Sequence, residues 1–392
     1  MLTADAVKAE GRRLGFDLVG IAAAERFVEA EGRLLEWIRQ QRHGEMGWID
    51  EDRARRSCRT DELLPGARSF IAVGAAYSRD AEGPPPPLHG RVARYARGRD
   101  YHDVLKERLW RLVAFLRRRA GPEVRTRLFV DTAPLLEREV AVRAGLGFYG
   151  KNTCLLTPGA GSYVLLGAIL TDLPLEPDQA PPRDCGQCRL CLDACPTGAL
   201  TEPYQLDSRL CISYLTIELR GPIPPELRPK LGDHVFGCDV CQEVCPWNHG
   251  HGLVPWPEFS APLPADLERH ATAQDSGAGR AGGPPSGADL DLIELLSLDD
   301  EGFRRRFKGS AITRAKRRGL LRNAAVVLGN RGDRRAVPAL ARAAAEDPDP
   351  LVREHAAWAL RRLGDPEAEA ALGEAVTART AGTSSATPPG AS

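Results

Sequence analysis

The stretch that decides the fold of the middle of this chain runs from Cys185 to Pro196 and reads CGQCRLCLDACP. Its cysteines have the spacing C-x2-C-x2-C-x3-C-P, which is typical of bacterial [4Fe–4S] sites. The first three thiolates can surround one cubane from a single short loop. The fourth, before the proline, is directed toward a second cluster. We therefore expect a ferredoxin-like module that holds two clusters.

A second array, Cys238-x2-Cys241-x3-Cys245-Pro246, provides the remaining ligands together with Cys211. With the last cysteine of each array crossing over, the expected ligands of the first cluster are Cys185, Cys188, Cys191 and Cys245, and those of the second are Cys195, Cys211, Cys238 and Cys241. Zinc sites or a disulfide scaffold are the alternatives, but neither needs the complete C-x2-C-x2-C-x3-C-P run. Cys58 and Cys154 lie outside both arrays and are expected to be plain thiols.

Length and composition describe a soluble globular protein of two or three domains. The chain has 392 residues, of which 43% are hydrophobic and 27% charged, with a formal net charge of zero. Apolar stretches such as residues 163–170 are too short to span a bilayer. The first residues contain neither a secretory signal nor a twin-arginine leader. Because thiols and clusters suit a reducing compartment, we expect a cytoplasmic protein that does not contact a membrane.

The order of predicted elements indicates five regions. Strands are expected over residues 17–22, 69–77, 125–130 and 163–171, and helices over residues 5–14, 27–41, 101–119 and 135–144. This alternation predicts an α/β domain over residues 1–180. The two-cluster module is expected over residues 181–255, a flexible connection rich in Gly, Pro and Ala over 256–298, a helical domain over 299–376 and a disordered tail over 377–392.

The helical domain contains an internal echo. Residues 321–333 resemble residues 352–365, each ending in Gly-Asp at an offset of 31 or 32 residues. Alanine-rich helices at this period are typical of HEAT-like repeats. With only about two units, an ordinary helical hairpin is the alternative.

Residues 145–150, GLGFYG, match the dinucleotide fingerprint G-x-G-x-x-G and, with Lys151, nearly match a P-loop. The segment before them is predicted to be helical, whereas the fingerprint needs a strand there. Asn152 stands where a P-loop needs a hydroxyl. We expect no nucleotide site here.

The same region resembles the signature of the epoxyqueuosine reductases. The resemblance is carried by residues 131–139 (DTAPLLERE) and 144–153 (AGLGFYGKNT), and by shorter blocks at 64–69, 100–102 and 195–200. It extends in the family's order from about residue 5 to about residue 375. It implies a monomeric enzyme that uses cobalamin and two [4Fe–4S] clusters to reduce epoxyqueuosine to queuosine at the wobble position of tRNA, with electrons from a donor such as flavodoxin or ferredoxin.

The resemblance also implies site residues. Asp131, between a predicted strand and a predicted helix, is expected to be the proton donor, with a pKa raised by burial beside the corrin. A helix-capping aspartate is the alternative. The implied corrin contacts are Arg56, Asp131, Lys151, Leu155, Leu166, Ser213, Asp239 and Val240. Arg56 stands beside the family's usual arginine position, here Ser57, and core packing is the alternative for the two leucines. No D-x-H-x-x-G motif offers a histidine to the cobalt.

A basic segment is the expected contact for tRNA. Residues 302–332 contain ten Lys or Arg and no acid, which favours a track for the phosphate backbone over an ordinary solvated face. The expected contacts are Arg314, Lys316, Arg317, Arg318 and Arg322. Two other functions remain open: a corrinoid reductase of another substrate, such as a dehalogenase, or a non-catalytic two-cluster electron carrier.

Overall fold

The computed structural model describes residues 2–78, 83–179, 183–250, 253–260, 289–364, 366–371 and 373. Each of its two compact units is built from segments that are separate in the sequence. The first unit comprises Met1–Glu82, Arg94–Cys211 and Asp239–Ala261, and the second comprises Gly83–Ala93, Ile212–Cys238 and Pro262–Ser392. The cysteine segment, expected as one module over residues 181–255, is thus divided between the two units.

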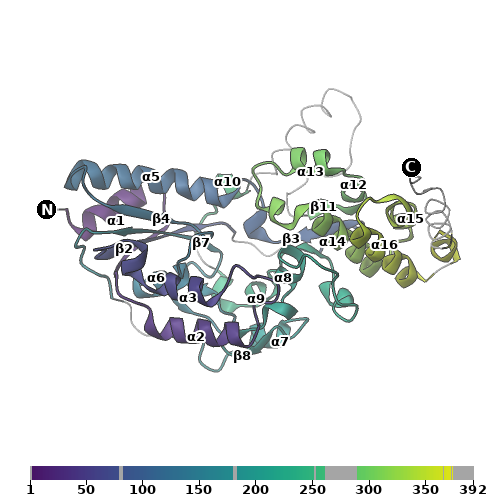
Figure 1. The fold of residues 1–392 in the computed structure, drawn as a ribbon, viewed down its shortest axis with the longest axis horizontal. Coiled ribbons are helices and arrows are strands. Elements are labelled where there is room, and N and C mark those ends of the chain that lie inside the picture. Colours follow the sequence, from purple (N-terminus) through teal and green to yellow (C-terminus); the bar gives the residue numbers. More distant parts are fainter. Residues whose placement is uncertain are drawn as a thin grey trace, which may run out of the picture. The chain divides into compact units, whose positions relative to one another are not determined.

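A four-stranded sheet forms the centre of the first unit (Figure 1). Its order is β1 (Leu18–Ala23), β2 (Ser69–Ala76), β7 (Val164–Thr171) and β4 (Thr126–Phe129), so all four expected strands are present. Every neighbouring pair is antiparallel. The sheet is thus not the parallel one typical of alternating helices and strands, because that alternation does not determine the direction in which each strand enters a sheet.

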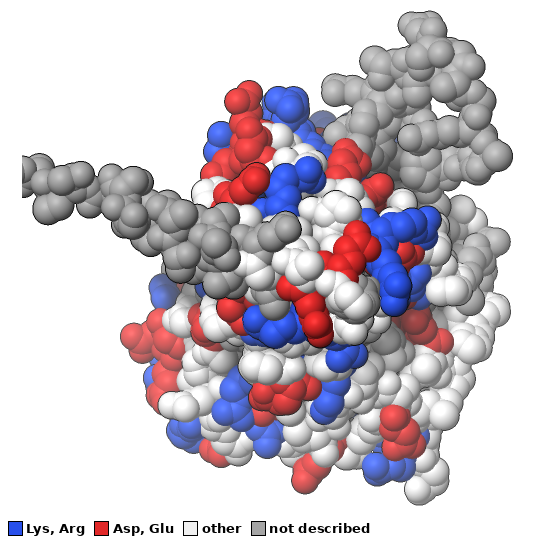
Figure 2. Space-filling model, turned by 90° about the vertical axis from the view of Figure 1, so that its right-hand side faces the viewer, with Lys and Arg blue, Asp and Glu red and all other residues white. Residues whose placement is uncertain are grey.

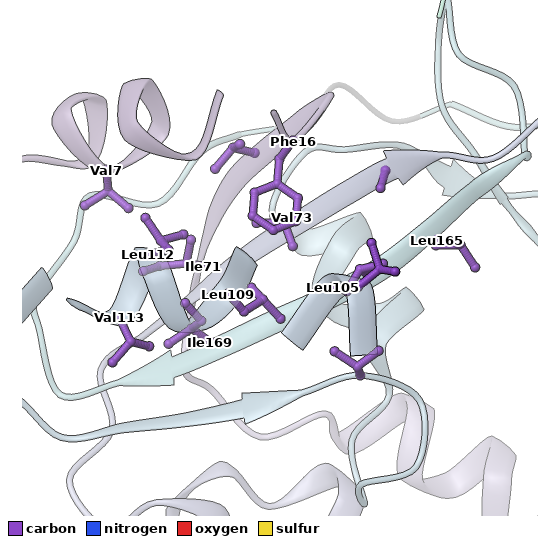
Figure 3. Packing of buried hydrophobic residues seen from close by; sticks show 14 of the residues in the cluster. Val7, Phe16, Ile71, Val73, Leu105, Leu109, Leu112, Val113, Leu165 and Ile169 are labelled. Carbon is purple, nitrogen blue, oxygen red and sulfur yellow. The ribbon is translucent and has the colours of Figure 1, made fainter. Parts of the chain in front are cut away.

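Helices cover both faces of this sheet, and β2 shows why. All its residues are buried, and alternate side chains point to opposite faces. Ile71 and Val73 pack with α1 (Ala4–Arg13) and α5 (Tyr101–Ala120), as Figure 3 shows. Phe70 packs on the other face. The helices there are α2 (Val28–Arg39), α3 (Glu51–Cys58), α4 (Thr60–Leu63) and α6 (Glu137–Arg143).

The rest of the first unit consists of short elements around the cysteines. These are β5 (Phe148–Tyr149) paired with β6 (Leu155–Leu156), α7 (Leu190–Ala194), β8 (Leu200–Glu202) paired with β9 (Gln205–Leu206), α9 (Val240–Glu243) and α10 (Pro257–Ser260). Trp256 and Phe259 belong to the core cluster on the α5 face of the sheet. The expected flexible connection therefore starts too early at residue 256, because these two aromatic rings are needed to complete the core.

The second unit combines a small sheet with helices. Its strand order is β10 (His234–Phe236), β3 (His89–Val92) and β11 (Asp289–Asp291). Its helices are α8 (Ile212–Ile217), α12 (Leu292–Leu296), α13 (Asp300–Arg306), α14 (Lys316–Arg331), α15 (Val337–Glu346) and α16 (Pro350–Leu363). Because β11 and α12 are ordered, the expected connection also ends too late. The remainder of it, residues 261–288, and the expected tail at 377–392 lie outside the described residues.

The sequence echo corresponds to two equivalent helices. Both α14 and α16 end at a glycine in the left-handed region, Gly332 with φ 70° and Gly364 with φ 61°. In each case the glycine N–H bonds back to a leucine carbonyl four residues earlier, which is the usual way to end a helix that must turn sharply. Helix α15 runs between them and packs on α16. Among the described residues, no helix has the length and apolar character needed to cross a membrane.

Candidate active site and cluster ligands

The four cysteines expected to hold the first cluster are neighbours in the first unit. The charge of the Cys191 thiol interacts with those of Cys185 and Cys245, and Cys245 interacts in turn with Cys185 and Cys188. Burial, followed by these neighbours, raises the pKa of Cys191 to about 11. The array at 185–195 and the end of the second array are therefore brought together as the crossing-over pattern requires.

Other residues hold the four cysteines of the first cluster in place. The Lys151 ammonium donates hydrogen bonds to the carbonyl oxygens of Gly186 (2.6 Å) and Cys188 (2.9 Å). Phe148, Leu156 and Trp247 pack with Cys245. Lys151 thus fixes the cysteine loop, which is a different role from the corrin contact that the resemblance implied.

The second set of cysteines is held by other contacts. The Cys195 sulfur lies 3.6 Å from the Thr197 hydroxyl, and the Cys238 sulfur lies 4.0 Å from Nε2 of His234. The Cys154 thiol, outside both arrays, hydrogen-bonds to Cys241. In the described part of the chain, no three His, Cys, Asp or Glu side chains are grouped as ligands of one metal ion. A [4Fe–4S] cluster is larger than a single metal ion and is held by four thiolates that lie around it.

Asp131 lies just after β4, where the backbone turns sharply. Its φ of 56° is in the left-handed region, which Asp tolerates better than most residues because its short polar side chain can bond locally. Its Oδ2 accepts hydrogen bonds from the Tyr101 hydroxyl (2.8 Å) and from Nε2 of His102 (3.2 Å). The side chain remains 63% exposed. The carboxylate is therefore held in place and still accessible.

The partners of Asp131 come from the start of α5. The rings of Tyr101 and His102 are stacked, with centroids 4.1 Å apart. Nδ1 of His102 lies 2.7 Å from Oδ1 of Asp100, the residue that caps α5. His102 thus connects two carboxylates, Asp100 on one ring nitrogen and Asp131 on the other.

The pKa shifts at this site correct the expectation for Asp131. Loss of solvent around the carboxylate tends to raise the pKa of Asp131. The hydrogen bonds from His102 and Tyr101 outweigh that effect, and the pKa is lowered. Burial likewise opposes the charge of His102, yet the bonds to Asp100 and Asp131 raise its pKa to about 9. Near neutral pH the proton of this pair therefore resides on His102, because both carboxylates bonded to its ring stabilise the charged imidazole.

Near Asp131, a second carboxyl group has a raised pKa: that of Glu137, which begins α6. Burial, and then the nearby Asp131 charge, raise its pKa to about 8. Its buried Oε1 has no hydrogen-bond partner among the described atoms. Glu137 stands in the same sequence block as Asp131, but the burial that raises its pKa depends on the fold and not on the local sequence. Sequence reasoning therefore missed it.

Two arginines brace the backbone around Asp131. Arg53 of α3 donates to the carbonyl oxygen of Thr132 (2.9 Å), and Arg138 of α6 donates to that of Thr153 (2.5 Å). Arg56, the residue implied by the resemblance, is exposed on the same helix as Arg53.

The other implied corrin contacts are dispersed. Leu155 and the half-buried Leu166 pack in the core cluster on the α6 side of the sheet. Asp239 is 2% exposed and accepts hydrogen bonds from the Arg94 N–H (2.8 Å) and the Gln242 amide (3.1 Å). These bonds hold the carboxylate within the protein, and the predicted contact of Asp239 with a cofactor stays a prediction. Val240, the first residue of α9, and Ser213, in α8, are half-buried.

Within the second unit, most of the predicted tRNA contacts are paired. Arg322 is fully buried, and Arg317 is buried against Asp347 with a separation of 2.6 Å. Arg314 pairs with Glu218 (2.9 Å) and Arg318 with Asp349 (3.1 Å). The prediction that Arg322 and Arg317 contact phosphates is therefore wrong, because both side chains are buried and bonded to other segments of the protein. Lys316 is exposed. On the face drawn in Figure 2, basic side chains are interspersed with acidic ones.

These features together define an iron–sulfur oxidoreductase with an acid–base site at the edge of an α/β layer and a helical-repeat extension. Family models agree: residues 57–132 match "Epoxyqueuosine reductase QueG, DUF1730", residues 184–248 a 4Fe-4S double cluster binding domain, and residues 310–385 HEAT repeats. The chain belongs to the epoxyqueuosine reductase family.

Relatives support this assignment over nearly the whole chain. Epoxyqueuosine reductase of Pseudomonas aeruginosa is 42% identical over 92% of this chain and 95% of its own length. That of Escherichia coli is 41% identical over 91% of this chain and 88% of its own. A crystal structure of epoxyqueuosine reductase with an epoxyqueuosine-modified tRNA-Tyr stem loop has a TM-score of 0.81 and 35% identity, covering 95% of this chain and 93% of that one. A Bacillus subtilis structure with the catalytic aspartate loop swung out of the active site has a TM-score of 0.81 and 34% identity, with the same coverage of both chains.

Proposed function

We propose that this protein reduces epoxyqueuosine to queuosine in tRNA, the last step of queuosine synthesis. The observation that carries the proposal is the Asp131–His102–Tyr101 group, which offers an exposed, hydrogen-bonded acid–base pair in a member of this family. The reaction removes the epoxide oxygen as water and leaves an alkene, so each turnover consumes two electrons and two protons. The chain must therefore deliver protons to the oxygen and electrons to the reacting carbon.

Asp131 is the proposed group that passes protons to the oxygen. At neutral pH its carboxylate accepts a hydrogen bond from protonated His102, so a proton can move through Asp131 toward the substrate while Asp100 stabilises the imidazole. Glu137, which keeps its proton up to about pH 8, is the proposed source of the second proton. The Tyr101 hydroxyl orients the carboxylate.

The cofactors follow from the same proposal. The cysteines hold two [4Fe–4S] clusters that pass single electrons inward from a donor such as flavodoxin or ferredoxin. Cobalamin, when bound, supplies the low-valent cobalt that carries out the reduction. The apolar side chain of Leu166, which is only partly buried, suits the flat face of a corrin, and Leu155 packs in the same cluster. Lys151 also fixes the cysteine loop, and Asp239 also accepts a hydrogen bond from Gln242 of α9.

The tRNA contact is proposed for the exposed part of the basic segment. Arg304, Arg305, Lys308 and Lys316 are exposed, and Arg314 and Arg318 are about half exposed at their ion pairs. Such side chains would position the phosphate backbone and carry little sequence information.

The test is turnover of epoxyqueuosine-containing tRNA by the anaerobically reconstituted full-length protein, with and without cobalamin, read by mass spectrometry of the nucleosides. We expect loss of one oxygen atom only when cobalamin is present. Intact clusters and bound corrin without turnover would favour a corrinoid reductase of another substrate. Failure to bind corrin would leave the electron carrier.

A further inference from the structure

Helix α14 carries two consecutive polar side chains, Arg322 and Asn323, that are both fully buried. Burying a guanidinium is costly unless its N–H groups find acceptors. Arg322 finds them in backbone carbonyl oxygens: those of Leu219 (2.9 Å) and Gly221 (2.7 Å) accept from Nη1, and that of Leu215 (2.5 Å) accepts from Nη2. The Asn323 side-chain oxygen accepts from both Nε (3.1 Å) and Nη2 (2.8 Å) of Arg322.

These carbonyls lie at the end of α8 and just beyond it. The last carbonyl groups of a helix have no partner within the helix and carry partial negative charge, so a cation placed among them is stabilised. Asn323 extends the contact to a second element, because its amide donates to the carbonyl oxygens of Thr216 (2.8 Å) in α8 and Val235 (2.9 Å) in β10. The pair therefore joins α8 to β10.

A further bond links these two elements next to the cysteines. The Thr216 hydroxyl donates to the carbonyl oxygen of Ile212 (2.7 Å) and accepts from the N–H of Gly237 (2.9 Å). Ile212 directly follows Cys211 in the chain, and Gly237 directly precedes Cys238. The segment that follows Cys211 and the segment that precedes Cys238 are thus joined by one hydrogen-bond network, which includes Arg322 and Asn323.

We propose that Arg322 and Asn323 are positioning residues for the second cluster, because they fix the segments that directly follow Cys211 and precede Cys238. The inference rests on the proposed assignment of Cys211 and Cys238 as ligands of that cluster. It gives the repeat a role that does not depend on tRNA, and it explains why the most basic segment of the chain includes an arginine with no exposed surface.

The experiment measures iron and sulfide per chain, and the EPR spectra of the reduced clusters, in the anaerobically reconstituted full-length protein. Arg322→Lys keeps the charge but cannot reach all the carbonyls, and Asn323→Leu removes the bridge to β10. Thr216→Val keeps the size of its side chain and removes only the hydroxyl, with its bonds to Ile212 and Gly237, so it decides the matter if the other variants fail to fold. Arg335→Lys, on an exposed arginine of the same repeat, is the control.

Wild-type and control protein should contain about eight iron atoms per chain. The Arg322 and Asn323 variants should fall to about four, with the spectrum of one cluster lost and that of the other unchanged. Thr216→Val should shift the spectrum or reduction potential of that same cluster. If all three variants keep both clusters with unchanged spectra and potentials, the proposal is overturned while the proposed function stands. If wild-type protein takes up only one cluster, the ligand assignment is overturned and this proposal with it.

Discussion

The Asp131 site and the basic segment both concentrate ionisable groups, but they neutralise them in opposite ways. Asp131 is bonded to Tyr101 and His102 and still keeps 63% of its side chain exposed. Arg317, by contrast, is buried with its carboxylate partner. Exposure therefore distinguishes charged groups that can contact a substrate from those that hold secondary-structure elements together. Sequence position alone did not distinguish the two.

The largest expected effect is that of removing the acid. Asp131→Asn should lower turnover by about 10²–10⁴-fold, because the amide cannot pass a proton to the departing oxygen. Iron content should be unchanged. Asp5→Asn, on an exposed residue of α1, is the matched control. Wild-type turnover in the Asp131 variant would assign the acid to another group, with Glu137 the first to examine.

Breaking a buried pair in the second unit should cost stability instead. Arg317→Ala leaves the Asp347 carboxylate buried without its partner and should lower the free energy of unfolding by about 3–5 kcal/mol. The neighbouring Lys316→Ala should change it by less than about 0.5 kcal/mol, since that side chain is exposed. Urea unfolding measures both. Equal effects of the two substitutions would mean that the buried Arg317–Asp347 pair does not stabilise the fold more than an exposed lysine does.

The titration of His102 should determine how the reaction rate depends on pH. With a pKa of about 9, it is protonated at neutral pH, so the wild-type rate should fall as pH rises through 9. His102→Gln should be slower by about 10²-fold and should lose the alkaline limb near pH 9, because the imidazole that titrates there is gone. Single-turnover rates from pH 6.5 to 10 give the profile. An unchanged alkaline limb in the variant would mean that another group controls it.

Glu137 should make the protein less stable as pH rises. Its pKa is about 8 in the folded protein against an ordinary 4.5, so between these values the folded state binds more protons than the unfolded state. Stability from this group is therefore lost as pH rises through that window. Glu137→Gln should gain stability relative to wild type between pH 5.5 and 8.5, measured by urea unfolding. Glu36→Gln, on an exposed residue, should show no such trend.

The smallest effect is expected for an exposed cation of the basic segment. Lys316→Gln should weaken tRNA binding modestly and reduce the salt dependence of the affinity by about one unit of slope. Arg117→Gln, exposed on α5, is the control. A salt slope equal to that of wild type would place the phosphate contact elsewhere.

The sequence predicted what depends on neighbours along the chain. The strands of the first unit, the two equivalent repeat helices and the spacing of the cysteines are all local patterns, and the structure contains each of them. The directions of the strands were not predictable in this way, because they depend on how long connections return to the sheet.

The chemistry of the site was predicted only in part, for a related reason. Asp131 was located by its motif, but the direction of its pKa shift depends on Tyr101 and His102, about thirty residues away in the sequence. Arg322 was misassigned because a count of charges in one window cannot show that carbonyl groups of residues 215–221 surround it.

The way the two units interleave along the chain has a consequence for synthesis. The first unit needs residues up to Ala261, including Trp256 and Phe259, while β3 of the second unit has already been made by residue 92. As the chain leaves the ribosome, β3 must wait for β10 and β11, which follow about 140 and 200 residues later. The first unit can therefore be completed once residue 261 has been made, whereas the second must wait for α16, and we expect no single cut to release either unit alone.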